Sequence, residues 1–185
     1  MTRHLTIAIA AALLCAASAK AGDGRDSVAL AAGLPSHFTW GVEAGSSIDL
    51  SGNDLSSIDI SAFFGYRCDY LQALGVGAGI HTALGNSNTM IPVYALARVS
   101  FAAKPRLCFL EGRVGYSVNT LEDDCSQNGI YFSAGVGFNL YQSRGVSSHI
   151  VLSYTYSELT PEEASGYTRY EKNFNAMSVR IGVSF

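Results

Sequence analysis

Apolar and polar residues alternate along most of this chain. Between Met177 and the C-terminal Phe185, every second residue is Met, Val, Ile, Val or Phe, and the residues between them are Ser, Arg, Gly and Ser. A period of two is typical of a β-strand with one apolar face. The same pattern recurs between turn residues and predicts strands at about 38–50, 56–68, 70–84, 89–102, 107–119, 129–141, 147–158 and 173–185.

The second face of these strands is unlike the exposed face of a soluble sheet. It is rich in glycine, as at Gly75, Gly77 and Gly79, and it carries isolated charges and a few large rings. Glycine weakens a strand that faces water. In a narrow barrel, small residues leave room for a few large ones. We therefore expect the apolar face to contact lipid and the mixed face to line a lumen, with a soluble β-sandwich as the competing fold.

Eight strands of this length match the smallest transmembrane barrels. The connections around 67–71, 102–107 and 142–147 are short, whereas those at 121–128 and 159–173 are longer and carry most of the acidic residues. The sequence thus predicts an all-β fold, a closed eight-stranded antiparallel transmembrane β-barrel with up-and-down topology over residues 38–185. Lipid-facing rings are expected in two girdles, the inner one at Trp40, Tyr66, Tyr70, Phe101 and Phe185, the outer one at Tyr116, Phe132, Tyr154 and Tyr156.

The N-terminal segment has the pattern of an export signal. Arg3 and His4 precede an apolar run over residues 5–17, and small residues then allow cleavage after Ala19 or Ala21. We expect residues 1–21 to be a signal peptide and residues 22–37 a periplasmic lead-in. Together with the barrel pattern, this signal predicts the outer membrane of a Gram-negative-type bacterium.

Composition removes several classes of function. The net charge is −3 and no basic cluster exists, so we expect no nucleic-acid partner. No Cys and His spacing suits a metal, and we expect no cofactor. Cys68 and Cys108 fall on the lipid side of the second and fifth strands, too far apart for a disulfide. Cys125 is expected in an outer loop, where it could form an intermolecular bond.

The export signal, the eight amphipathic strands and the stretches "LEGRVGYSV", "YFSAGVGFNLY" and "VRIGVSF" resemble the small outer-membrane barrel family of the OmpA/OmpX type. The resemblance covers most of the chain after the signal. It implies that the barrel-assembly machinery reads the final strand, with Phe185 as the assembly signal, and that outer-membrane lipid surrounds the barrel. A fold of this type does not by itself supply a function.

Inward-facing charges are the most informative polar residues. If the turn after the fourth strand is centred between Lys104 and Pro105, Arg98 lies opposite Glu111. Other inward charges are expected to pair across the first and last strands or to extend this contact, namely Glu43, Arg180, Arg113 and Asp59. A buried charge requires a partner. Because an eight-stranded interior is just wide enough for its side chains, we favour a salt-bridged plug over a charged channel.

The outer loops and the seventh strand hold the remaining candidates. Exposed aromatic and charged residues at Tyr167, Arg169 and Tyr170 could form a recognition surface. The lipid A 3-O-deacylase family carries a His-x-Ser motif near the outer end of its seventh strand, but here Thr155 stands two residues before Ser157. We therefore predict no catalytic residue and expect a non-enzymatic role in envelope integrity or surface interaction. A small pore is the alternative, and a lipid A-modifying enzyme is a weaker one.

Overall fold

The computed structural model describes residues 38–52, 55–68, 70–84, 88–101, 107–121, 125–143, 145–161 and 173–185. The strands are β1 (Phe38–Asp49), β2 (Ser57–Tyr66), β3 (Leu71–Ala83), β4 (Thr89–Ser100), β5 (Cys108–Leu121), β6 (Cys125–Ser143), β7 (Val146–Ser157), β8 (Thr160–Pro161) and β9 (Phe174–Ser184). The expected signal peptide, at residues 1–21, and lead-in, at residues 22–37, lie outside the described residues.

No helix in the described part of the chain has the length and apolar character needed to cross a membrane.

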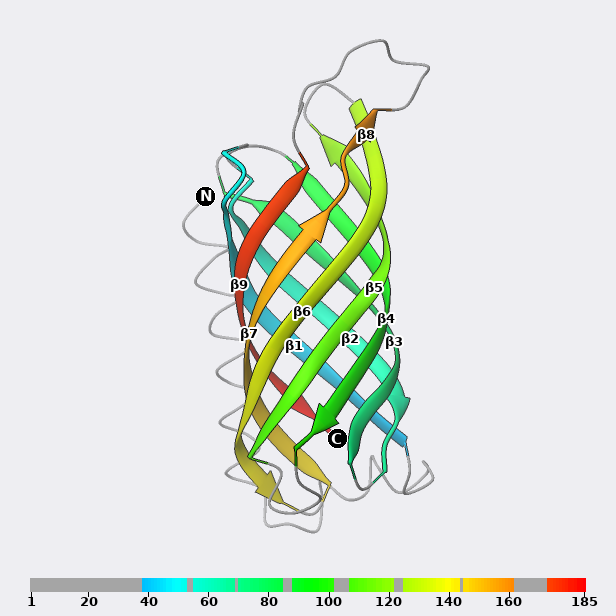
Figure 1. Ribbon diagram of the computed structural model, residues 1–185, viewed down its shortest axis with the longest axis vertical. Helices are drawn as coiled ribbons and strands as arrows, with labels where there is room; N and C mark the ends of the chain where they lie inside the picture. Colours follow the sequence, from blue (N-terminus) through cyan, green and yellow to red (C-terminus); the bar gives the residue numbers. More distant parts are fainter. Residues whose placement is uncertain are drawn as a thin grey trace, which may run out of the picture.

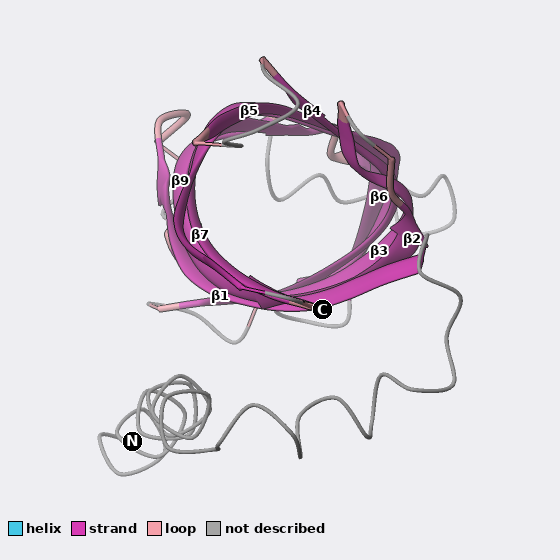
Figure 2. Ribbon diagram, turned by 90° about the horizontal axis from the view of Figure 1, so that it is seen from below, coloured by secondary structure: helices cyan, strands magenta, loops and turns pink. Residues whose placement is uncertain are grey.

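Eight long strands close into a barrel, which Figure 1 shows from the side and Figure 2 along its axis. From β1 to β7 each strand pairs antiparallel with the next, and β9 pairs with both β7 and β1. The two-residue β8 pairs only with β6 among the described strands. The predicted fold class is confirmed. The barrel has a short-turn end, where β2–β3, β4–β5 and β6–β7 connect, and a long-loop end opposite.

The alternation assigns the two faces as the sequence predicts. Leu74, Val76 and Ile80 on β3 point outward and are 52 to 62% exposed. The inward face combines glycines with large rings, because the glycines give those rings room. A Cβ atom at Gly77 would lie 2.6 Å from the Tyr94 ring, and one at Gly137 would overlap the Phe109 ring. The barrel therefore exposes apolar side chains on its outer wall and keeps its buried charged and polar side chains in the lumen.

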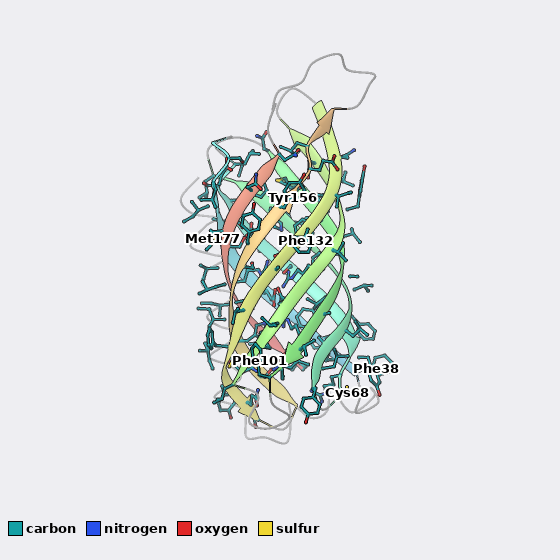
Figure 3. The ribbon with its side chains drawn as sticks, viewed as in Figure 1. Phe38, Cys68, Phe101, Phe132, Tyr156 and Met177 are labelled. Carbon is teal, nitrogen blue, oxygen red and sulfur yellow. The ribbon has the colours of Figure 1, made fainter. Side chains whose placement is uncertain are left out.

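Exposed rings gather towards both ends of the wall. Phe38 and Phe101 lie near the short-turn end and Phe132 and Tyr156 near the long-loop end (Figure 3). Tyr66, Tyr70, Tyr116 and Tyr154 add outward rings at 43 to 60% exposure. Aromatic rings at two levels are expected where a barrel meets both membrane–water interfaces.

β5 and β6 extend further at the long-loop end than the sequence predicts. The predicted outer loop at 121–128 is largely strand, since Leu121 pairs with Cys125 and β8 pairs with Gln127 and Asn128. The backbone of Cys125 therefore lies in β6, and its placement in a loop was wrong. β6 and β8 rise above the other strands in Figure 1.

Candidate functional site: the lumen and the long-loop rim

Five charged side chains from four strands meet in the lumen. Glu111 accepts hydrogen bonds from Arg98 Nε at 2.7 Å, Arg113 Nε at 2.8 Å and Arg180 Nη2 at 2.6 Å. Glu43, across the lumen on β1, forms ion pairs with Arg98 and Arg113. All five side chains are at most 3% exposed. The two carboxylates thus hold three guanidinium groups in one connected cluster, which we call the charge network.

The charge network is more branched than the two separate pairs expected from the sequence. The register places Arg98 opposite Glu111, but it places Glu43 opposite Gly182 rather than Arg180. Arg180 donates its hydrogen bond to Glu111, and its Nε lies 3.7 Å from Glu43 Oε2. The expected pair across the first and last strands is therefore present as an ion pair, and Arg180 shares itself between Glu43 and Glu111. Long arginine side chains reach past their neighbouring strand because the lumen is narrow.

His149 on β7 also belongs to the charge network, and no sequence pattern predicted this contact. Its Nε2 lies 2.8 Å from Glu43 Oε1 and 3.1 Å from Arg98 Nη1, and its side chain is 1% exposed. The inward side of β7 could have been read from its alternation with Val151 and Ser153, both buried. The contact with Glu43 could not, because β1 and β7 are not paired strands.

Asp59 faces the lumen, as the sequence predicts, but its contacts in the described part of the chain lie outside the charge network. Its carboxylate accepts a 2.6 Å hydrogen bond from Ser57 and a second bond from Ser47. His81 Nδ1 lies 3.1 Å from Asp59 Oδ1. Ser47 Oγ is also 2.8 Å from Ser178 Oγ on the neighbouring strand β9, so hydroxyl groups line the inner wall beside Asp59. Asp59 therefore anchors a second polar layer.

Two buried tyrosines, on β4 and β6 at either side of β5, lie between these polar layers. Arg113 Nη1 donates a 3.0 Å hydrogen bond to Tyr94 Oη, and the Tyr94 and Tyr131 ring centroids are 5.8 Å apart. Tyr131 in turn lies edge-on to His81, with ring centroids 6.2 Å apart. The rings are 1 to 2% exposed and fill the width between the charge network and the Asp59 layer.

Buried apolar side chains close the lumen at the long-loop end. They form one cluster, called here the apolar cap: Leu55, Met90, Leu159, Phe174 and Ala176. Each is at most 5% exposed. Met90 pairs with His81 and Asn119, and Ala176 pairs with Thr155, all of which face inward. The apolar cap was not predicted from the sequence, because the alternation was taken to place the apolar side chains of each strand on the lipid face.

Side chains at the long-loop rim fix the roots of the connections. Asp49 at the end of β1 accepts hydrogen bonds from Ser51 N at 2.8 Å and Leu55 N at 3.2 Å. Ser51 Oγ accepts a 3.3 Å bond from Asn175 N, which links the β1–β2 connection to β9. Asn173 Oδ1 accepts a 3.3 Å bond from Leu159 N. These contacts, with the apolar cap beneath them, join three separate parts of the chain at one end of the barrel.

The remaining sequence candidates are scattered. Phe185 stacks on Trp40 with ring centroids 4.5 Å apart, and the two residues exchange backbone hydrogen bonds of 2.8 and 3.2 Å. Ser157 is fully buried in the lumen. Cys68 is exposed and Cys108 is half-buried. Tyr167, Arg169 and Tyr170 lie outside the described residues.

Within the described ranges, no group of three or more His, Cys, Asp or Glu side chains is arranged to hold a metal ion.

Solved structures with the same architecture are available for comparison. The crystal structure of Neisserial surface protein A matches with a TM-score of 0.58 and 14% identity, covering 81% of this chain and 96% of that one. The chain has the fold of the small outer-membrane β-barrels. The N-terminal β-barrel domain of Pseudomonas aeruginosa OprF matches with a TM-score of 0.50 and 12% identity, covering 80% and 97%. No family model and no curated protein sequence matches the chain.

Proposed function

We propose that this chain is an exported, non-enzymatic protein of the outer membrane that acts through its long-loop end, in envelope integrity or surface interaction. The aliphatic outer wall and the two levels of rings support insertion in a lipid bilayer. The long-loop end then faces outward and the short-turn end faces the periplasm. Phe185, stacked on Trp40, would serve as the signal read by the assembly machinery.

The observation that carries this proposal is the ordered rim. Asp49 and Ser51 tie the β1–β2 connection to β9, and the apolar cap anchors Leu55 and Leu159 from below. β8 adds a short strand to the raised end of β6. Holding loop roots in place lowers the ordering cost of binding, which is how a scaffold prepares a recognition surface. Such construction is expected where the loops, rather than the lumen, carry the function.

The lumen favours a plug over a pore. An ion would have to pass the charge network, the paired tyrosines and the apolar cap in turn. The apolar cap has no polar groups to replace the hydration water that an ion would lose. It therefore resists permeation even if the charge network rearranges. In planar bilayers we expect no steady conductance from the purified barrel. A steady conductance that changes in Arg98→Gln or Glu111→Gln would establish a pore and overturn this part of the proposal.

The position of Ser157 argues against lipid hydrolysis. A deacylase serine must meet its substrate on the lipid side, whereas Ser157 is fully buried and faces inward between Tyr131 and Phe174. His149, on the same strand, contacts Glu43 and Arg98 at the other end of the lumen. Cells that express the protein should therefore show an unchanged lipid A mass. A mass change that Ser157→Ala abolishes would contradict the non-enzymatic role.

A complementation experiment tests the loop role directly. A strain lacking the gene is compared for survival in detergent and for cell–cell aggregation, with the wild-type chain or with a chain lacking residues 162–172. We expect the wild type to restore the strain's phenotype and the shortened chain to fail, although both reach the membrane in equal amounts. A matched control carries Glu158→Gln at the rim and should behave as wild type. Full activity of the shortened chain would refute a role for this loop.

A further inference from the structure

A cavity opens into the barrel at the short-turn end, on the far side of the charge network from the apolar cap. Its volume is about 120 Å³, which accommodates a few water molecules or one small ion. Thr39, Ser147 and Ser184 contribute hydroxyl groups to its wall, Gln72 contributes an amide, and Arg67 and Arg98 contribute guanidinium groups. The cavity is called here the inner vestibule. The proposed function gives it no role.

The charge around the inner vestibule is one-sided. Both charged residues among its described lining residues are arginines, and no described lining residue is acidic. The charge network at its base contains three arginines and two glutamates, which leaves one positive charge in excess before His149 is considered. Asp59, a further carboxylate of the described lumen, lies in the other polar layer beside His81, so the positive excess is local to the base of the inner vestibule. A positive excess behind low-dielectric walls attracts anions.

Arg98 forms a rigid base for the inner vestibule. Its guanidinium carbon lies 4.5 Å from the Phe63 ring centre and 5.3 Å from the Phe109 ring centre. Glu43 and Glu111 fix the same group by ion pairs, and the residue is 2% exposed. A group held on several sides changes little when a ligand arrives, so binding costs little reorganisation. Hydrogen bonds also hold the wall of the inner vestibule in place. Gln72 Nε2 donates a 2.7 Å hydrogen bond to Ser100 Oγ, and Ser147 Oγ lies 2.8 Å from Ser184 Oγ.

We propose that the inner vestibule binds a small oxyanion, a phosphate or carboxylate group, from the short-turn side. The hydroxyl groups of Thr39 and of the Ser147–Ser184 pair donate hydrogen bonds to its oxygens, and the positive base attracts its charge. The charge network and the layers above it stop the anion from crossing, so the site is a blind pocket that takes up the ligand and releases it by the same opening. This role is independent of the long-loop end and persists if the loop proposal fails.

Titration with inorganic phosphate tests the site in the purified full barrel, refolded in detergent micelles. Backbone amide NMR shifts of Thr39, Ser147 and Ser184 are followed at constant ionic strength, with acetate as the carboxylate probe and chloride as the reference. We expect saturable shifts with phosphate or acetate, confined to the short-turn end, and no saturation with chloride. Linear shifts that match those with chloride, or shifts spread evenly around the barrel, would overturn the proposal.

Matched amide-to-carboxylate variants supply the control. Gln72→Glu places a negative charge in the inner vestibule, whereas Asn173→Asp places one at the opposite end of the barrel. We expect phosphate affinity to fall at least about tenfold in Gln72→Glu and to stay within about twofold of wild type in Asn173→Asp. Circular dichroism checks that each variant is folded. Equal affinity in all folded variants would show that phosphate binds elsewhere.

Discussion

Glu43→Gln tests how much the charge network contributes to the stability of the barrel. Glu43 faces Arg98, Arg113 and His149, and its side chain is fully buried. Glutamine keeps the shape but replaces one acceptor oxygen with an amide that points at cationic donors. Arg98 and Arg113 keep Glu111 as their remaining carboxylate. Breaking a buried ion pair on one side costs about 3–5 kcal/mol, so we expect a loss in the free energy of unfolding of this size.

The assay is equilibrium unfolding in guanidinium chloride of protein refolded into phospholipid vesicles. Trp40, the only tryptophan, reports the transition because it stacks on Phe185 at the seam between β1 and β9. A loss of this size corresponds to a midpoint lower by about 1 M for a typical denaturant slope. Glu158→Gln at the rim serves as the control and should change stability by less than about 0.5 kcal/mol. A Glu43→Gln loss below about 1 kcal/mol would refute the reasoning.

A double variant separates charge from packing. The Glu43→Gln change takes away one of the two carboxylates that pair with Arg98. Adding Arg98→Met then removes the cation that has lost this partner. If the cost of Glu43→Gln arises from uncompensated charge, the loss of stability in the double variant should be smaller, by about 1–3 kcal/mol, than the sum of the losses in the two single variants. Strict additivity would indicate that Glu43 acts through packing alone.

Three further substitutions probe other layers by the same unfolding assay. Phe174→Ala empties part of the apolar cap and should cost about 3 kcal/mol, whereas an unchanged midpoint would show that the cap is not tightly packed. Tyr131→Phe removes a buried hydroxyl group that has no hydrogen-bond partner in the described structure, so stability should stay equal or rise by up to about 1 kcal/mol, and a clear loss would reveal a hidden partner. Gly137→Ala directs a methyl group into the Phe109 ring and should cost about 1–3 kcal/mol, and a neutral result would mean that the ring moves freely.

The sequence was sufficient for the fold because a membrane barrel has a simple rule for each residue. Every second side chain must face lipid, so alternation identifies the strands and their outer faces at once. Leu74 and Val76 follow this rule, and so do the inward Glu111 and Arg113. The β4–β5 register followed from the length of one short turn, and the structure pairs Arg98 with Glu111.

The lumen was less predictable because its contacts cross between strands that are not paired. Arg98 on β4 contacts Glu43 on β1 and His149 on β7. No local sequence pattern predicts a contact between strands that lie so far apart around the barrel. Strand tilt decides which inward residues share a level, and tilt is not visible in a single sequence. The apolar cap was missed for a related reason. Met90 and Ala176 are apolar like the residues of the lipid face. Only their position in the alternation, one residue away from a lipid-facing residue, distinguishes them from that face.

The order of the layers explains why the two ends of the barrel suit different tasks. The charge network lies beside the inner vestibule, where Gln72 and Ser184 keep a polar path to the short-turn side. The apolar cap lies beneath the rim, where Leu55 and Leu159 come from the connections themselves. Closing the long-loop end with side chains from its own connections seals the lumen and also fixes those connections. Under the proposed function, this single set of contacts both blocks the passage of ions and supports the rim at which binding takes place.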